Sequence, residues 1–398
     1  MRILYALNAF RPLIDGVTIS IERQALGLVA RGHAVAIVAP GSSFSDYTEV
    51  GPGYRIYRLR AISVAGQRRR VSLLPSRAIA AALADFQPDV VVVSAPFLLS
   101  RAMRESAHRH GYPVVGITSV MPEWFDYNVG PIRPLGRLFR DGLWRVITAY
   151  YNRCDHVVAV TRTALRYLTD HGLRRPASVI SNGVPIDRFR PRKRQDELAR
   201  RFGIPEKPTV LYTGRLDPEK CMDVWMRAVP RVRRMLDAHF VIGGDGVMRR
   251  GLERMAERAG IRHAVTFVGF LPDEDYAEIF SLADVFAITS PVELQSVVIL
   301  EAAASGLPVV GVRAGALPEF IRQGENGCLV APGDDSALAE ALIELLSRPA
   351  DRLRMGQAAR AAALTHDLDH TIDQYERLYS AIARPRPRIL APWSCPRA

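Results

Sequence analysis

The most informative residues of this chain are two glutamates with a predicted helix start between them, because carboxylates at such a spacing can bind a polar ligand. Glu293 and Glu301 stand eight residues apart in SPVELQSVVILE. On a helix, eight residues advance about 12 Å, roughly the span from one sugar across a diphosphate to another sugar. Backbone N–H groups near Leu294–Val297 would face an anion between the two carboxylates. The spacing therefore indicates a binding site that contacts both ends of a nucleoside diphosphate sugar. The alternative is an ordinary strand–helix unit with two surface glutamates.

Two cations follow the predicted strand Thr209–Thr213, in the sequence TGRLDPEK. Arg215 offers a planar fork of N–H donors and Lys220 a compact point charge, and both kinds of cation bind phosphate oxygens. Their place just beyond the end of a strand therefore predicts contacts to a diphosphate. The alternative is a pair of solvated surface cations beside an Asp-Pro turn.

Glycines mark three turns that follow predicted strands. Gly16, in DGVT, opens the first predicted helix, where the backbone could approach a phosphate or a sugar closely. Gly244 lies in GGDG, which is not the GxGxxG fingerprint and lacks its later acidic residue, so an NAD site is disfavoured. Gly269 and Phe270 could offer backbone groups and a ring to a nucleobase. Each of these glycines would also suit an ordinary turn.

Short apolar runs alternate with helical stretches, which is typical of parallel α/β architecture. The strands predicted in the first half are Ile3–Leu7, Ala34–Val38, Val90–Ser94, Val114–Thr118 and His156–Val160. Those predicted in the second half are Thr209–Thr213, His239–Ile242, Val265–Val268, Val285–Ile288 and Val309–Val312. Predicted helices between and after them include Asp273–Ser281, Ser296–Ser305 and Leu368–Ile382. The pattern predicts two Rossmann-like domains facing a cleft, with ligands at the carboxyl ends of the strands.

The predicted division of the chain is an N-terminal domain over residues 1–183, a linker over 184–195 and a C-terminal domain over 196–365. The linker lies in the turn-rich, charged stretch ISNGVPIDRFRPRKRQ. A helix over 366–384 is expected to return to the N-terminal domain. The tail 385–398, rich in proline and arginine, is expected to be disordered.

The net charge of +12 is confined to the N-terminal half. Residues 1–190 contain 25 Arg, no Lys and 13 Asp plus Glu, whereas residues 191–398 contain 28 cations and 28 anions. The first half is therefore expected to face a nucleic acid, an anionic lipid surface or a phosphorylated substrate. A high-GC genome would explain the preference for arginine better than it explains this asymmetry.

The composition disfavours several classes of protein. With 398 residues and 48% apolar content, the chain can form two domains with real cores. No apolar run approaches the roughly 18–20 residues of a membrane span. The N-terminus is typical of a first strand and not of a secretory signal. Four widely spaced cysteines without a CxxC argue against disulfides and zinc, and favour a cytoplasmic protein.

These motifs occur in the order found in GT-B glycosyltransferases of the family-4 type, which the chain resembles over nearly all of residues 1–383. The resemblance rests on FRPLIDGVTISIERQALGLVARGH, VISNGVPIDRF, GRLDPEK, GGDG, VGFLPDEDY, ELQSVVILEAAASGLPVV and ALPEFI…GENGCLVAPGD. The ordered set is far more specific than any single motif. The subgroup resembled acts on lipid or lipid-linked acceptors, as diacylglycerol glucosyltransferases and phosphatidylinositol mannosyltransferases do.

The resemblance implies a role for each matched residue. Arg215 and Lys220 would hold the diphosphate and stabilise the charge of the leaving group. Glu301 would bind the ribose hydroxyls, Glu293 would bind hydroxyls of the transferred sugar, and Gly16 would approach the donor from the opposite domain. The resemblance also implies transfer with retention and without a metal. It implies no cofactor, because the nucleoside diphosphate sugar is a co-substrate.

The chain departs from the family pattern at two places. The first is Leu294, Gln295 and Ser296, whose backbone amides would meet the sugar and phosphate where many relatives have Gly-Phe-Gly. The second is Ser119 in GITSVMPEW, where relatives commonly have His. A hydroxyl cannot take the acid–base part of an imidazole. Either Glu123 or Asp126 therefore substitutes, or the acceptor itself shuttles the proton, or the enzyme is slow or altered. Activity is expected to survive, and a large rate gain in Ser119→His would show that this position is impaired.

Cations and aromatic side chains gather on the expected acceptor side. The residues concerned are Arg68, Arg69 and Arg70, together with Arg137, Arg140 and Trp144 of a predicted helix over 135–153. The combination is typical of an interfacial membrane contact. A helix packed in the N-terminal domain with an arginine-bearing outer face explains it equally well.

Three hypotheses follow. The first is a retaining transferase that moves glucose or mannose from a nucleoside diphosphate to a lipid or lipid-linked acceptor at the inner membrane face, with no nucleic acid partner. The second keeps this donor but uses a soluble acceptor, namely a small molecule, a sugar phosphate or a glycan. The third is a catalytically weak protein that binds a nucleotide sugar or nucleic acid. A glycosidase built on Glu293 and Glu301 is disfavoured, because a helical spacing of about 12 Å exceeds the roughly 5–9.5 Å that such pairs need.

Overall fold

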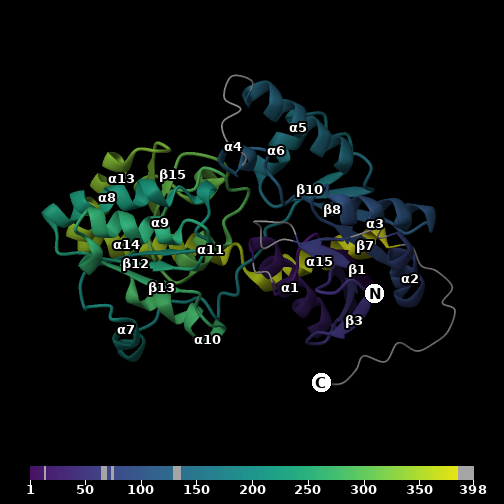
Figure 1. Ribbon diagram of the computed structural model, residues 1–398, viewed down its shortest axis with the longest axis horizontal. Helices are drawn as coiled ribbons and strands as arrows, with labels where there is room; N and C mark the ends of the chain where they lie inside the picture. Colours follow the sequence, from purple (N-terminus) through teal and green to yellow (C-terminus); the bar gives the residue numbers. More distant parts are fainter. Residues whose placement is uncertain (13–14, 64–69, 73–75, 129–135, 384–398) are drawn as a thin grey trace. The chain divides into compact units, whose positions relative to one another are not determined.

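The computed structural model describes residues 1–12, 15–63, 70–72, 76–128 and 136–383 (Figure 1). The chain divides into two compact units. Unit 1 comprises Met1–Pro122, Pro134–Asn182 and the chain from Leu368 onward, and unit 2 comprises Gly183–Asp367 together with a short stretch that begins at Glu123. Each unit contains a mainly parallel sheet with helices, which confirms the predicted α/β fold class.

The described part of unit 1 contains an eight-stranded sheet in the order β10-β9-β8-β7-β1-β2-β4-β3, parallel except for the pairing of β3 with β4. Its strands are β1 (Arg2–Ala6), β2 (Ala34–Pro40), β3 (Tyr47–Val50), β4 (Arg55–Leu59), β7 (Val90–Val93), β8 (Val114–Ile117), β9 (His156–Ala159) and β10 (Ala177–Val179). A separate hairpin pairs β5 (Ala61–Ser63) with β6 (Arg70–Ser72). The central strands are Val- and Ile-rich and fully buried because they have neighbours on both sides.

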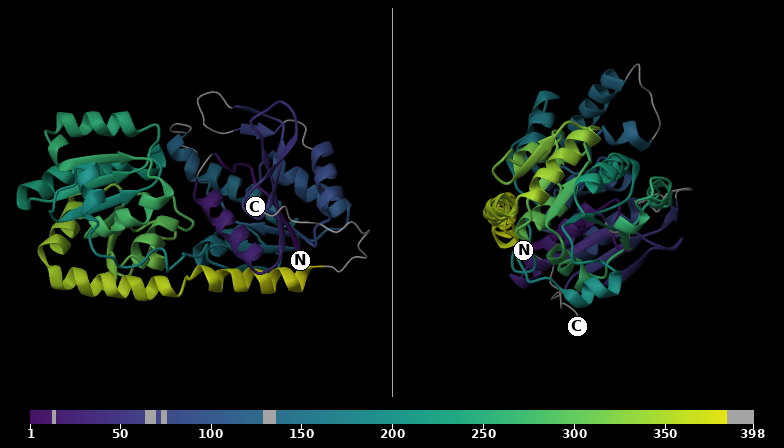
Figure 2. Two further views of the ribbon diagram at one scale, coloured as in Figure 1. Left: turned by 90° about the horizontal axis from the view of Figure 1, so that it is seen from below. Right: turned by 90° about the vertical axis from the view of Figure 1, so that its left-hand side faces the viewer.

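The helices of unit 1 are α1 (Gly16–Ala30), α2 (Ser76–Phe86), α3 (Leu98–Arg109), α5 (Gly136–Tyr151), α6 (Arg162–Asp170) and α15 (Leu368–Ile382). The carboxylate of Asp15 caps α1 by accepting a hydrogen bond from the Thr18 amide at 2.8 Å. The C-terminal helix α15, drawn in yellow, lies beside the purple α1 (Figures 1 and 2). Arg31, which follows α1, pairs with Asp373 and Glu376 of α15.

The described part of unit 2 contains a six-stranded parallel sheet in the order β13-β12-β11-β14-β15-β16. The strands are β11 (Thr209–Thr213), β12 (His239–Gly243), β13 (Val265–Gly269), β14 (Val285–Ile288), β15 (Val309–Val312) and β16 (Gly327–Val330). The chain runs outward from β11 to β13 and then returns to β14 on the other side of β11. The boundary between β11 and β14 is therefore the point at which the winding reverses, where ligands of open α/β sheets bind.

Most helices of unit 2 contribute buried residues to a hydrophobic core. The helices of this unit are α4 (Trp124–Asn128), α7 (Asp196–Phe202), α8 (Met222–Met235), α9 (Arg249–Arg258), α10 (Asp273–Tyr276), α11 (Val297–Ala304), α12 (Leu317–Phe320), α13 (Asp335–Ser347) and α14 (Pro349–Leu364), with short 3₁₀ turns η2 (Pro218–Lys220), η3 (Arg262–Ala264) and η4 (Glu278–Leu282). Helix α13 packs on α8, and α14 packs on α11. Among the described residues, no helix has the length and apolarity that a membrane span requires.

The segment 184–195, predicted to be a linker, is built into unit 2. Val184 and Phe189 are fully buried and belong to the core of this unit. The guanidinium of Arg360 donates hydrogen bonds to the carbonyls of Ile186 and Phe189, which holds the segment against α14. Two isolated apolar residues among turn-formers and charges show no periodicity, so the sequence did not reveal that this interdomain connection packs against unit 2.

Candidate functional site

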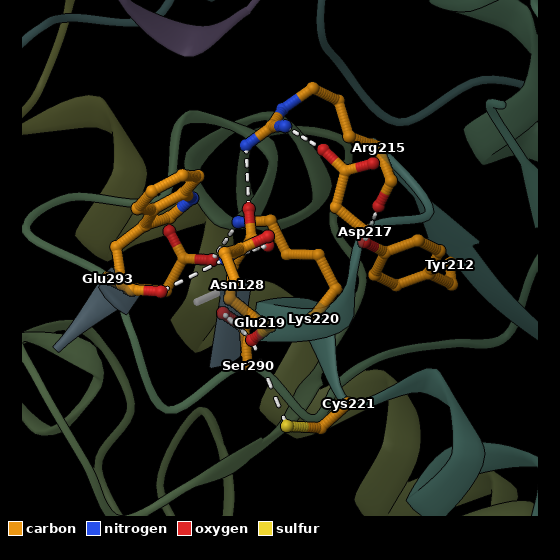
Figure 3. Close-up of polar contacts among 10 residues, drawn as sticks. Asn128, Tyr212, Arg215, Asp217, Glu219, Lys220, Cys221, Ser290 and Glu293 are labelled. Carbon is orange, nitrogen blue, oxygen red and sulfur yellow. Dashed lines mark hydrogen bonds and ion pairs between the residues drawn. The ribbon is translucent and has the colours of Figure 1, made fainter. Parts of the chain in front are cut away.

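The carboxyl ends of β11 and β14 bring Lys220 and Glu293 together (Figure 3). Lys220 ends η2, which follows β11, and its Nζ donates to Glu293 Oε1 at 2.7 Å. Both side chains are largely buried, at 17% and 9% exposure. The two residues are 73 positions apart in sequence and meet because neighbouring parallel strands end at one edge of the sheet.

Arg215, which follows β11, pairs with two carboxylates and stays about a third exposed. Its guanidinium pairs with Asp217, and Arg215 Nη2 donates to Glu219 Oε1 at 2.8 Å. The second oxygen of Glu219 accepts from Asn128 Nδ2 of α4 at 3.1 Å (Figure 3). Burial opposes the charge on Glu219, but the attraction of Arg215 and the hydrogen bond from Asn128 outweigh it, so the pKa of this carboxyl lies below its ordinary value.

Backbone contacts fix the loops that carry these side chains. Ser290 Oγ donates to the carbonyl of Glu219 at 3.2 Å, and Thr289 Oγ1 donates to the carbonyl of Lys220 at 3.0 Å. The amide of Ala316 donates to the carbonyl of Glu293 at 2.8 Å. The loops after β11, β14 and β15 therefore form one connected edge, and the charged groups are held in place before any ligand binds.

Glycines let the loops after β11, β12 and β13 approach one another. The amide of Gly244 donates to the carbonyl of Gly269 at 2.7 Å, and the amide of Gly214 donates to the carbonyl of Gly243 at 3.0 Å. Gly244 has a φ of 120°, and a Cβ there would lie 1.9 Å from the carbonyl oxygen of Gly214. Glycine at this position is therefore required by the packing of the chain itself.

Only part of the chain between Glu293 and Glu301 is helical. Helix α11 begins at Val297, so Glu293 lies in the preceding loop and the helical distance of about 12 Å does not apply. The spacing of these two carboxylates therefore no longer argues against a glycosidase. Glu301 is 1% exposed, and its Oε2 accepts from the hydroxyl of Tyr276 at 2.7 Å.

The remaining predicted donor residues of unit 2 lie at the same sheet edge. Leu294, Gln295 and Ser296 are buried in the turn before α11, with Ser296 at the N-cap position. Gly269 ends β13 with a φ of 75°, and the next side chain, Phe270, is 65% exposed. The carbonyl of Gly269 already accepts one hydrogen bond, from Gly244.

Two predicted residues belong to unit 1. Gly16 is the first residue of α1, and a Cβ there would meet nothing within 4 Å. The fold of unit 1 therefore does not itself require a glycine at this position. Ser119 is half-buried in the loop that follows β8.

The expected membrane residues are only partly described. Arg68, Arg69 and the tail 385–398 lie outside the described residues, as does the side chain of Arg137. Arg70 is half-buried and donates to the carbonyl of Gly41 at 3.2 Å, and Arg140 is half-buried on α5.

Trp144 is not a membrane-facing residue in this fold. It is 4% exposed, and its ring lies against Tyr167 and His171 with centroids 5.1 and 5.8 Å away. An amphipathic helix in a domain core and one at a bilayer have the same sequence pattern, so the pattern alone could not separate them.

Sequence reasoning missed three residues of this site. Glu219 lies between the two predicted cations, four residues after Arg215, and that spacing could have identified it. Asn128 and Tyr276 gave no local signal, because their partners are 91 and 25 residues away along the chain. In the described part of the chain, no group of three or more His, Cys, Asp or Glu side chains could hold a metal ion.

Comparison with protein families identifies the class to which this architecture belongs. Residues 14–188 match the model described as Glycosyltransferase Family 4, and residues 194–362 match the model described as Glycosyl transferases group 1. The chain therefore belongs to the family-4, group-1 glycosyltransferases, which confirms the resemblance seen in the motifs.

Relatives of known activity place the chain among hexosyltransferases that use a nucleotide-sugar donor. A GDP-mannose-dependent alpha-mannosyltransferase of Corynebacterium glutamicum is 28% identical, with 83% of this chain and 76% of the relative covered. A GDP-mannose-dependent alpha-(1-6)-phosphatidylinositol monomannoside mannosyltransferase of Mycolicibacterium smegmatis is also 28% identical, over 91% and 93%. A D-inositol 3-phosphate glycosyltransferase of Streptomyces scabiei is 32% identical over 59% of this chain and 55% of its own length.

Solved structures agree on the fold, which is GT-B. Sucrose-phosphate synthase from Thermosynechococcus elongatus has a TM-score of 0.79 at 21% identity and covers 96% of this chain and 98% of its own. Anabaena HepE, solved with UDP and glucose, has a TM-score of 0.74 at 19% identity over 96% and 100%.

Proposed function

We propose that this hexosyltransferase transfers mannose or glucose, with retention and without a metal, from a nucleoside diphosphate to a lipid or lipid-linked acceptor. The observation that carries the proposal is the convergence of Arg215, Lys220 and Glu293 at the point where the winding of the unit 2 sheet reverses. Two cations held at this edge suit a diphosphate. The carboxylate of Glu293 beside Lys220 suits sugar hydroxyls. GDP-mannose is the first donor to test, because the relatives that cover most of the chain are named as GDP-mannose-dependent.

Binding of the donor would exchange one set of ionic partners for another. Lys220 and Arg215 now pair with carboxylates, and the diphosphate would take over part of these contacts. Glu293 could then accept hydrogen bonds from the sugar, while Glu301 would accept them from the ribose. The cations would stabilise the negative charge that develops on the diphosphate as its bond to the sugar breaks, which supplies the charge that a metal ion provides in other transferases.

The transfer itself would break the bond between the anomeric carbon and the diphosphate oxygen and form a bond to the acceptor hydroxyl on the same face. The acceptor proton would pass to the departing diphosphate, because Ser119 occupies the place where an imidazole is common. A serine hydroxyl can hydrogen-bond a sugar but is not a base at neutral pH.

A lipid acceptor is supported by a relative that acts on phosphatidylinositol monomannoside and by the charge of the N-terminal half. Unit 1 contains a cavity of about 230 Å³, lined by Asn8, Tyr47, Arg58 and Arg70 among others. Arginine and tyrosine suit a phosphorylated polyol headgroup. We place the enzyme at the inner face of the plasma membrane, where anionic lipids attract basic surfaces.

A soluble phosphorylated acceptor is the second candidate. It is favoured by the relative that glycosylates D-inositol 3-phosphate and by the same arginine-lined cavity. The two candidates share the donor and the phosphate chemistry, and they differ in whether the acceptor carries acyl chains.

Transfer and thermal-shift assays test the proposal. GDP-mannose or UDP-glucose at about a hundred times its Kd should stabilise the protein by about 2.7 kcal/mol. Lys220→Ala and Glu293→Ala should lose at least about 100-fold in kcat/KM. Lys207→Ala, which removes a lysine paired with Asp237 on the surface of the same unit, is the matched control and should behave like the wild type. No stabilisation and no transfer with any nucleotide sugar would contradict the proposal.

A further inference from the structure

We propose that Tyr276 is a positioning residue that sets Glu301 for recognition of the donor ribose. The inference rests on the proposed function, in which Glu301 binds the ribose hydroxyls. Tyr276 ends α10, and its hydroxyl donates to Glu301 Oε2 at 2.7 Å. Glu301 itself lies in the middle of α11, in a helix that is almost entirely buried.

The contact has a clear physical role. Burial of a carboxylate disfavours its charge unless donors compensate, and the phenolic hydroxyl supplies one such donor. The bond to Oε2 also selects one orientation of the carboxylate. A carboxylate oxygen can accept two hydrogen bonds, so the bond from Tyr276 does not by itself prevent Glu301 from accepting hydrogen bonds from ribose hydroxyls.

Tyr276 is itself held by an aromatic cluster. Its ring contacts Phe189 and Phe280 edge-on, with centroids 6.0 and 5.9 Å away, and these two rings meet each other at 5.7 Å. Edge-to-face packing on two sides restricts the ring to one orientation. The direction of the Tyr276 hydroxyl is therefore set by the packing of the core.

The segment that carries Phe189 also fastens both ends of the stretch that contains Tyr276. Arg188 donates to both carboxylate oxygens of Asp273, at 3.0 and 2.9 Å, and Arg192 pairs with Glu278. Arg192 Nη2 also donates to the carbonyl of Arg188 at 2.8 Å. The stretch predicted to be an interdomain linker thus holds both ends of the segment from which the Glu301 contact is made.

Discrimination between ribose and deoxyribose isolates this role from general stability. The experiment compares kcat/KM for GDP-mannose, or UDP-glucose if that is the donor, with kcat/KM for its 2′-deoxyribose analogue. In the wild type the ribose donor should be preferred about tenfold or more. Tyr276→Phe keeps the ring and removes only the hydroxyl. It should raise KM for the ribose donor about tenfold, leave kcat unchanged and reduce the preference.

Two further variants complete the test. Glu301→Gln should reduce the same preference, and adding Tyr276→Phe to it should have no further effect on the ratio, because the tyrosine acts through the glutamate. Tyr54→Phe is the matched control, since it removes a tyrosine–glutamate hydrogen bond of 3.1 Å, to Glu22 in unit 1. Its ratio should equal that of the wild type.

The outcomes distinguish a failure of the positioning role alone from a failure of the ribose assignment of Glu301. If Glu301→Gln reduces the preference but Tyr276→Phe does not, or if Tyr276→Phe slows both donors equally, the positioning role is wrong while the donor site stands. If the wild type turns over both donors equally well, or Glu301→Gln leaves the ratio unchanged, Glu301 does not read the ribose. That result overturns its assignment under the proposed function and this inference together.

Discussion

At the scale of single residues, the cations of the proposed donor site are balanced by nearby carboxylates. Arg215 pairs with Asp217 and Glu219, and Lys220 pairs with Glu293. Charges that are largely removed from water need such partners. The pairing also orients the cations, so a diphosphate would meet groups that are already in position.

Replacing Glu219 by Gln should make stability less dependent on pH in the acid range. The folded-state pKa of Glu219 is lowered, so its carboxylate stabilises the fold fully above its unfolded-state pKa, and this contribution is lost as the pH falls through the folded-state pKa. The wild type should therefore exceed Glu219→Gln in Tm at neutral pH, and the gap should shrink towards pH 3. Thermal unfolding followed by circular dichroism from pH 7 to pH 3 measures this gap.

Glu325→Gln is the control for this measurement. Glu325 pairs with Arg322 at 2.9 Å, but both side chains are more than half exposed, so the substitution should change Tm little at any pH. A gap between wild type and Glu219→Gln that stays constant across the pH range would show that the charge of Glu219 does not stabilise the fold.

At the scale of elements, the proposed site depends on loops that approach one another closely. Gly244→Ala should destabilise the protein by several kcal/mol or prevent folding, because its Cβ would collide with the Gly214 carbonyl and its φ of 120° is unfavourable for alanine. Gly251→Ala is the matched control in α9, where a Cβ meets nothing within 4 Å. It should be neutral or stabilising by up to about 1 kcal/mol. Denaturant unfolding measures the free energy of unfolding of both variants. Equal values would contradict the close approach of the loops at Gly244.

The segment 184–195 should contribute to the stability of unit 2 through its buried aromatic ring. Phe189→Ala should reduce the free energy of unfolding by about 3–5 kcal/mol, because a fully buried ring would leave a cavity in the core. Phe44→Ala removes a ring that is 80% exposed and should cost less than about 0.5 kcal/mol. Urea titrations of the two variants make the comparison. A loss below about 1 kcal/mol for Phe189→Ala would mean that the segment contributes little to the core of unit 2.

The elements that were predictable from sequence are those with strong apolar runs or a clear helical spacing of apolar residues. The strands Thr209–Thr213, Val285–Ile288 and Val309–Val312 and the helix Leu368–Ile382 have the predicted bounds. The predicted helix Asp273–Ser281 divides into α10 and η4, a division that the sequence pattern did not reveal. Short strands at sheet edges, such as β3 and β10, escaped prediction because they are half-exposed and carry no long apolar run.

The proposed site was predictable only in part. The motifs indicated Arg215, Lys220, Glu293 and Glu301, but not which carboxylate each cation contacts, because those contacts depend on the order of strands in the sheet. The strand order places β14 beside β11 and so joins Lys220 to Glu293. No local pattern could have revealed that Tyr276 contacts Glu301.

At the scale of the whole molecule, the charge asymmetry predicts a salt-dependent association with anionic membranes. The excess of arginine in residues 1–190 should bring the protein down with vesicles of phosphatidylglycerol and phosphatidylcholine at about 20 mM salt. Release is expected at about 1 M salt, where the Debye length falls to about 3 Å. Co-sedimentation with pure phosphatidylcholine vesicles is the control and should be absent. No binding to anionic vesicles at low salt would favour the soluble acceptor.

A crystal structure with the bound donor, GDP-mannose or UDP-glucose, whichever stabilises the protein, would locate the diphosphate. We expect the pyrophosphate in contact with Arg215 and Lys220, the sugar hydroxyls at Glu293 and the ribose at Glu301. A pyrophosphate bound away from both cations would contradict this expectation.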